Sequence, residues 1–226
     1  MINNISDFNK CSNCGACYNI CPNNAITVDS EELFYALRVD ENKCSKCGLC
    51  KKVCPVNSPN DTLKPSGAYS VINNNISDVL SSSSGGMFAA LAEYVLENNG
   101  IVYGAVFSED KKSVFINSSL MHSLDELKRS KYVESSIGYI FKDVKLQLKN
   151  GKLILFTAAP CQIAGLKRYL GSDGDSDNLI TCDFSCGGMP SHKIYKEYLN
   201  RIEKKLRAPI TYVNFRPKIY GWLYHA

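Results

Sequence analysis

A cysteine motif that occurs twice near the start of the chain constrains the fold more than any other feature. The copies are Cys11-Ser-Asn-Cys14-Gly-Ala-Cys17-Tyr-Asn-Ile-Cys21-Pro22 and Cys44-Ser-Lys-Cys47-Gly-Leu-Cys50-Lys-Lys-Val-Cys54-Pro55. In each copy, two, two and three residues separate the cysteines, and a proline follows the fourth one. Such crowding indicates a small unit that is held together by something other than a large apolar core.

This spacing is typical of bacterial ferredoxins with two 4Fe-4S clusters, in which the fourth cysteine of each run binds the other cluster. Three closely spaced thiolates can bind three irons of one cubane, while the fourth cysteine begins a turn that points away. Gly15 and Gly48 let the backbone pass close to the sulfur atoms. We therefore predict cluster one on Cys11, Cys14, Cys17 and Cys54, and cluster two on Cys44, Cys47, Cys50 and Cys21.

Structural zinc is the alternative interpretation, because paired Cys-x-x-Cys spacings also form Cys₄ zinc sites. The reciprocal repeat with both prolines fits iron–sulfur ligation better. No secretory signal or membrane-spanning run is visible, so we expect a cytoplasmic protein in which clustered cysteines serve metal or redox chemistry. The net charge of +4 is small, and no Lys/Arg block predicts nucleic-acid binding.

The length of 226 residues and the position of the motif suggest two domains. We assign 1–60 to the ferredoxin domain, 61–68 to a linker and 69–226 to an α/β domain with a mixed sheet, so the chain is α+β overall. Within the first domain we expect strands at 25–28 and 34–39. In the second, strands are expected at 69–72, 101–107, 114–116, 153–157, 179–184 and 210–215, and helices at 87–97, 123–129, 139–148, 162–170 and 191–206.

Two local patterns in the second domain could bind a ligand. Ser83, Ser84, Gly85 and Gly86 precede a helical run, and free N–H groups there would suit a phosphate, although local chemistry alone favours an ordinary serine N-cap. Cys161 follows Pro160 at the start of another expected helix, where a thiolate is favoured. With Cys182 and Cys186, it could join a third cluster or take part in redox chemistry, or all three could be inert buried thiols.

Four motifs together resemble the coenzyme F-420 hydrogenase/dehydrogenase beta-subunit family, in the form with a fused N-terminal ferredoxin. These motifs are Ser83-Ser84-Gly85-Gly86-Met-Phe-Ala-Ala-Leu, Ser130-Lys131-Tyr132-Val-Glu-Ser, Pro160-Cys161-Gln162-Ile-Ala-Gly-Leu and Asp183-Phe-Ser-Cys186-Gly-Gly-Met-Pro190-Ser. The resemblance runs from about Lys10 to the end of the chain. It implies an iron–sulfur flavoprotein that uses FAD or another flavin.

The resemblance also implies roles for particular residues. Ser83–Gly86 would form the flavin phosphate loop, Lys131 would contact flavin or substrate, and Thr157, Pro160 and Gln162 would line the pocket. Cys161 and Cys186 would bind a possible third 4Fe-4S cluster, and Lys131 and Cys161 are the candidate catalytic residues.

The chain departs from the usual family pattern at Ala158 and Gly187, where relatives commonly have glycine and histidine. His192 lies nearby, and we expect it to face solvent at the start of a helix. Family members normally continue well beyond the stretch that ends at Ala226, so we expect an incomplete second domain.

These features favour an oxidoreductase in which the clusters exchange single electrons with a flavin that transfers hydride. Its partner would be a redox protein or a small redox coenzyme, within an oxidoreductase complex or outside one. The alternative is a non-catalytic electron-transfer subunit that docks on a partner enzyme.

Overall fold

The computed structural model describes residues 5, 10–59 and 64–218, and its ferredoxin segment consists of two short helices and a β-hairpin. Helix α1 spans Ala16–Ile20 and helix α2 spans Leu49–Lys52. Strands β1, Ile26–Asp29, and β2, Ala36–Val39, pair antiparallel with Ile26 opposite Val39. The two strands expected between the cysteine repeats are confirmed. Residues 61–63 of the predicted linker lie outside the described part of the chain.

A mixed sheet forms the centre of the second segment, as predicted; it has five strands, one of which, β5, was not predicted. Its order is β5-β4-β3-β6-β7, and only the central pair β3 and β4 is antiparallel. The strands are β3 Ile101–Phe107, β4 Val114–Ser118, β5 Ser135–Ser136, β6 Ile154–Thr157 and β7 Leu179–Cys182. Because β3, β6 and β7 are parallel, their carboxyl ends share one edge of the sheet, where ligands commonly bind in α/β proteins.

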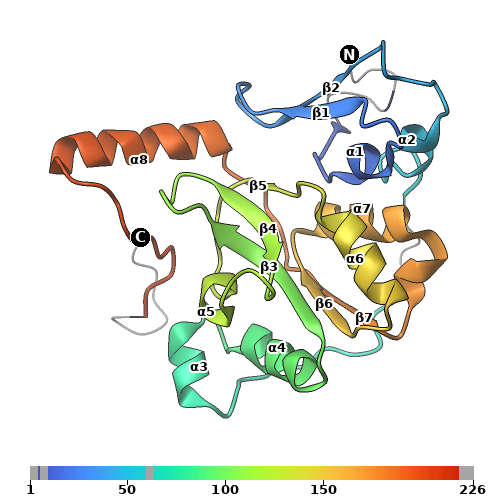
Figure 1. The fold of residues 1–226 in the computed structure, drawn as a ribbon. Helices are drawn as coiled ribbons and strands as arrows, with labels where there is room; N and C mark the ends of the chain where they lie inside the picture. Colours follow the sequence, from blue (N-terminus) through green and yellow to red (C-terminus); the bar gives the residue numbers. More distant parts are fainter. Residues whose placement is uncertain (1–4, 6–9, 60–63, 219–226) are drawn as a thin grey trace.

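Helices cover both faces of this sheet (Figure 1). Alternate strand residues point to opposite faces, so Val102 and Leu155 pack with α4 (Met87–Glu97), whereas Tyr103 and Phe156 pack with α6 (Ile140–Lys149) and α7 (Pro160–Leu170). The remaining elements are α3, α5 and α8, and a 3₁₀-helix, η3, that follows α7. The bounds are α3 Ile76–Ser81, α4 Met87–Glu97, α5 Leu124–Leu127, α6 Ile140–Lys149, α7 Pro160–Leu170, η3 Gly171–Asp175 and α8 His192–Leu206.

The predicted strands at 69–72 and 210–215 are wrong. Tyr69, Val71 and Ile72 are all more than half exposed, and the backbone there has no strand partner. Phe215 packs with the rings of Phe107 and Tyr195 instead of joining the sheet. β-forming residue types in these segments therefore do not by themselves produce a hydrogen-bonded ladder.

The ferredoxin segment and the α/β segment share one apolar core. Ala16, Cys17 and Tyr18 of α1 belong to the same buried cluster as Phe141 of α6 and Leu166 of α7. A Cβ on Gly165 would lie 2.9 Å from both the Cβ and the Sγ of Cys14, so α7 approaches the first cysteine repeat at backbone distance. The two segments are therefore packed together by core residues and not merely tethered.

None of the helices in the part of the chain that the structure describes has both the length and the apolar character needed to span a bilayer.

The approach of α7 to the first repeat predicts that Gly165→Ala destabilises the protein. Helix propensity alone would stabilise this variant by about 1 kcal/mol, but overpacking against Cys14 costs about 1–3 kcal/mol and should outweigh it. We expect a melting temperature several degrees lower in scans at one fixed rate. Gly187→Ala is the control, because nothing lies within 4 Å of its added Cβ. A melting temperature for Gly165→Ala at or above that of the natural protein would contradict this packing.

Candidate functional site

The first cysteine repeat forms a cavity that is completed by a cysteine of the second repeat. Cys11, Cys14, Cys17 and Cys54 line this cavity together with apolar side chains such as Leu37 and Val56. These four cysteines are the set that the spacing predicts for cluster one. Gly15 and Gly48 have φ angles of 85° and 78° at the starts of α1 and α2, so both repeats adopt the same turn before their helices.

The electrostatics of this cavity suit thiolates that are bound to iron. Burial raises the pKa of Cys14 to about 12, and it raises the pKa of Cys17 still further with added repulsion from Cys14, Cys11 and Cys54. Without a cation these thiols would stay protonated at neutral pH. Iron supplies the positive charge that stabilises them as thiolates, so the donor set fits a cluster.

The second repeat is more exposed than the first. Cys44 and Cys47 raise the pKa of Cys50 after the larger effect of burial, so these three thiols lie near one another. Cys47 is exposed, whereas its counterpart Cys14 is buried. Cys21 accepts a hydrogen bond from the Ala25 amide at 3.3 Å, and its binding to cluster two remains a prediction.

Among the described residues, no three His, Cys, Asp or Glu side chains lie close enough together to hold a single metal ion. A cubane makes a different demand, because each thiolate binds its own iron.

Cys161 and Cys186, which the sequence suggests as extra ligands, lie together beside the first repeat. Cys186 and Cys161 interact electrostatically, the Ser12 side chain hydrogen-bonds to Cys161, and the charge of Cys161 acts on Cys14. The expectation of a favoured thiolate at Cys161 is wrong in sign. Burial raises its pKa and outweighs the hydrogen bond from the Gln162 amide. Cys182 ends β7 on the other face of the sheet, beside the α4 cluster.

The start of α4, where the sequence suggests a phosphate loop, is uncapped by any side chain. Gly86 has a φ of 82° and immediately precedes the helix. Four residues earlier, at the end of α3, the Ser82 hydroxyl is buried without a hydrogen-bond partner among the described residues. An unpartnered buried hydroxyl and free helix N–H groups fit a phosphate of a bound flavin. Gly85 has another role, because a Cβ there would lie 2.8 Å from the Val71 carbonyl oxygen.

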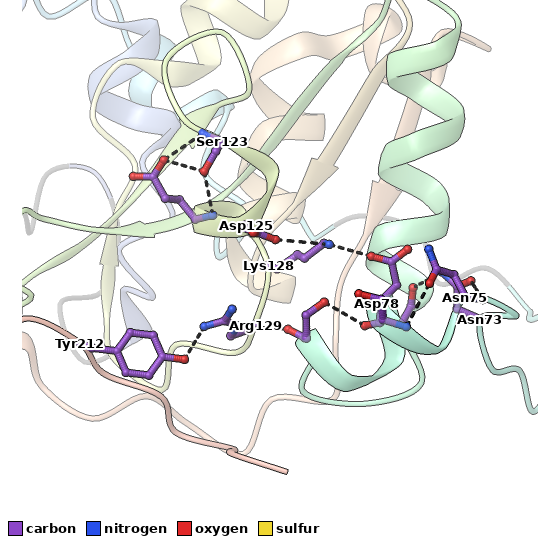
Figure 2. Close-up of polar contacts among 12 residues, drawn as sticks. Asn73, Asn75, Asp78, Ser123, Asp125, Lys128, Arg129 and Tyr212 are labelled. Atoms are coloured by element: carbon purple, nitrogen blue, oxygen red, sulfur yellow. Dashed lines mark hydrogen bonds and ion pairs between the residues drawn. The ribbon is translucent and has the colours of Figure 1, made fainter. Parts of the chain in front are cut away.

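Lys131 lies on the loop next to this turn. The Ser130 amide donates to Ser83 Oγ at 2.8 Å, and Figure 2 shows Lys128 on the same loop paired with Asp78 of α3 at 2.7 Å. Lys131 Nζ donates to the carbonyls of Lys128 and Arg129 in a cavity that Phe107 also lines. Burial, and then the charge of Arg129, lower the pKa of Lys131 to about 7. A neutral amine in this cavity can act as a base or a hydrogen-bond partner.

The other predicted pocket residues make contacts within the protein. Thr157 Oγ1 donates to the Tyr103 carbonyl at 2.9 Å. Gln162 is buried, its amide nitrogen donates to the Ser135 carbonyl, and its amide oxygen accepts from the Ala159 amide. Pro160 is the first residue of α7. This segment begins where β6 ends, and α7 packs on the opposite face of the sheet from α4.

The expectation that His192 faces solvent is wrong. Its ring is buried, stacks on Tyr35 at 3.8 Å, and hydrogen-bonds to Glu134 at 3.0 Å and to the Ser30 carbonyl at 3.0 Å. Glu134 also accepts a hydrogen bond from Asn13 in the first cysteine repeat. The sequence did not predict these contacts of Glu134, because each partner lies more than fifty residues from Glu134 along the chain.

Residues 10–58 match the sequence profile of the 4Fe-4S dicluster domain family. This segment is a two-cluster ferredoxin domain. The match supports iron–sulfur clusters over structural zinc in the first domain, and it covers none of the second. A search of curated proteins found no match to this chain.

The cavity composition predicts that Cys54→Ser removes the cluster of the first repeat. Iron should fall from about eight to about four atoms per chain after anaerobic preparation. The electron paramagnetic resonance signal lost in Cys54→Ser should be the signal lost in Cys14→Ser, and Cys182→Ser should keep both signals. Loss of the signal that depends on Cys47 instead would contradict reciprocal ligation.

The burial of Lys131 predicts unusual reactivity at neutral pH. Competitive acetylation followed by mass spectrometry should show that the labelling rate of Lys131 rises with pH with a midpoint near pH 7. Ordinary lysines titrate at about 10.4. Because burial disfavours the charged form, the neutral amine should dominate above this midpoint. A midpoint close to that of ordinary lysines would contradict the environment described.

Proposed function

We propose that this chain is an iron–sulfur flavoprotein oxidoreductase, in which the ferredoxin domain exchanges electrons with a flavin at the carboxyl edge of the α/β sheet. The ferredoxin domain itself indicates iron–sulfur electron transfer. The finer proposal adds the flavin and a hydride-exchanging substrate. Bound clusters would supply single electrons, and a bound flavin would couple them to hydride transfer.

The observation that carries this proposal is the contact between the first repeat and α7. Cys14 meets the backbone of α7 at Gly165, and Cys161 at the start of that helix acts electrostatically on Cys14. Electron transfer becomes slower as centres move apart, so this packing favours transfer from cluster one into the second segment. A cluster that served only as a structural brace would not need Cys161 and Cys186 beside it.

The chain's own residues would bind and orient the flavin at two places along the sheet edge. The first turn of α4 and the Ser82 hydroxyl would hold a phosphate. Lys131, held by the Lys128 and Arg129 carbonyls, would present an amine whose pKa of about 7 allows it to accept or hold a proton. Cys161 and Cys186 are proposed as ligands of a third cluster.

A second candidate is a non-catalytic electron-transfer subunit without flavin. The hydrogen bonds of Thr157 and Gln162 within the protein favour it, because the polar groups expected to line a flavin pocket already have partners.

Flavin content decides between these candidates. Anaerobically purified protein should contain about eight irons, or about twelve with a third cluster, and about one flavin per chain. Gly86→Ala should lower flavin content several-fold at unchanged iron, because its left-handed turn shapes the start of α4. The matched control is Gly151→Ala, which has a φ of 73° but nothing within 4 Å of an added Cβ. Protein that carries full iron but neither contains flavin nor takes up added FAD would overturn the flavoprotein proposal and favour the subunit.

A further inference from the structure

The two cysteine repeats have the same spacing but opposite surroundings. At matching positions, the first repeat has Asn13, Ala16, Tyr18 and Asn19, and the second has Lys46, Leu49, Lys51 and Lys52. Tyr18 and Asn19 are 3% and 2% exposed. All four of the second-repeat side chains are exposed, including Leu49 at 39%.

The equivalent glycines show what covers one repeat and leaves the other open. A Cβ on Gly15 would lie 2.9 Å from the Ile137 side chain, and nothing lies within 4 Å of one on Gly48. Asn19 donates to the Gly138 carbonyl, which fixes α1 to the second segment. The α2 side of the ferredoxin domain lies away from the central sheet (Figure 1). Arg168 of α7 donates to the Lys52 carbonyl at 3.0 Å, but the side chains of Lys46, Leu49, Lys51 and Lys52 face solvent.

We propose that the lysine face, defined as Lys46, Leu49, Lys51 and Lys52 around the second repeat, is the docking surface for a small acidic one-electron carrier protein. This inference rests on the iron–sulfur part of the proposed function and is independent of flavin. In the step, the carrier loses one electron and the cluster of the second repeat gains it, or the reverse. No covalent bond forms or breaks, and no proton is transferred.

Charge complementarity identifies the class of partner. Among the described residues, no ion pair engages the ammonium groups of Lys46, Lys51 and Lys52, whereas nearby Lys43 pairs with Asp40 at 3.7 Å. A cluster with its thiolates is anionic, so the lysines at the surface place positive charge between it and an approaching partner. Positive charge there steers an acidic protein toward the exposed cluster and reduces its repulsion by the cluster.

The small size of the face suits a transient redox encounter. Electron-transfer complexes bury less than about 1,200 Å² and dissociate readily. Leu49 offers an exposed apolar side chain next to Cys50 for contact with the partner, and the exposed lysines of the same repeat add charge. Nucleic acid is a weaker fit, because no aromatic side chain for base stacking occurs between Lys43 and Cys54.

Binding and electron transfer with a purified acidic 4Fe-4S ferredoxin test this proposal on the full chain. The charge-reversal variant K46E/K51E/K52E should raise the dissociation constant by about tenfold or more at low salt. The increase should be smaller at high salt. The second-order rate of electron transfer, measured by anaerobic stopped flow, should fall by a similar factor. The control K196E/K204E/K205E makes the same change in net charge on exposed lysines of α8 and should change both values less than about twofold.

Iron content and cluster spectra of each variant show whether the second repeat is intact. If K46E/K51E/K52E loses iron, the neutral variant K46Q/K51Q/K52Q replaces it, with a smaller expected loss of affinity in the same direction. Equal effects of the two charge-reversal variants would overturn the proposal, as would binding of a short single-stranded RNA through the lysine face in preference to the ferredoxin. Flavin content is measured on the same samples. Protein without flavin that still binds the ferredoxin through the lysine face would contradict the flavoprotein proposal and leave the docking surface standing.

Discussion

Burial of the first cysteine repeat against α7 is the interaction on which the rest of the structure depends. Gly165 lets the helix backbone reach Cys14, and the side chains of α1 extend the core of the sheet into the ferredoxin domain. Any side chain at position 165 would separate these two surfaces. The contact thus joins the cysteine motif, whose spacing determines the cluster chemistry, to the α/β segment, of which α7 is a part.

This burial makes two nearly identical repeats chemically different. Apolar surroundings raise the thiol pKa values of Cys14 and Cys17, while Cys47 lies in water with its pKa lowered by the Leu49 amide and the Ser45 side chain. One end of the ferredoxin domain therefore faces a partly dry interior and the other faces solvent. The junction of His192, Glu134 and Tyr35 reinforces this orientation by holding the β1–β2 hairpin against the start of α8. Ser191 also donates to the Leu33 carbonyl at this junction.

Much of the fold was predictable from local patterns. The cysteine spacing predicted the ferredoxin domain, and apolar periodicity located α4 with its observed bounds of Met87–Glu97 and most strands of the sheet. Helix α3 was missed, although Asn75 caps it by accepting from the Ser77 amide, and this N-cap residue is its sequence signal. The predicted strand at 210–215 failed because Phe215 packs between aromatic rings, and residue type alone does not distinguish that contact from a ladder.

The candidate site was less predictable, since it depends on partners that are distant in sequence. Spacing placed Cys54 with the first repeat, and the cavity supports that grouping. The burial of His192 and the hydrogen bond from the Gln162 side chain to the Ser135 carbonyl arise only from tertiary packing. The raised pKa of Cys161 has the same origin, because desolvation by the packed domains exceeds the effect of the helix start.

The asymmetry between the two repeats can be measured most directly by hydrogen exchange of the intact, anaerobically prepared protein. Residues 14–20 and 47–53 have matching motif positions and therefore serve as each other's control. The structure predicts markedly slower amide exchange over 14–20, because α7 and the turn at Ile137 and Gly138 cover that segment. Equal rates, or slower exchange over 47–53, would contradict the burial of the first repeat and the orientation built on it.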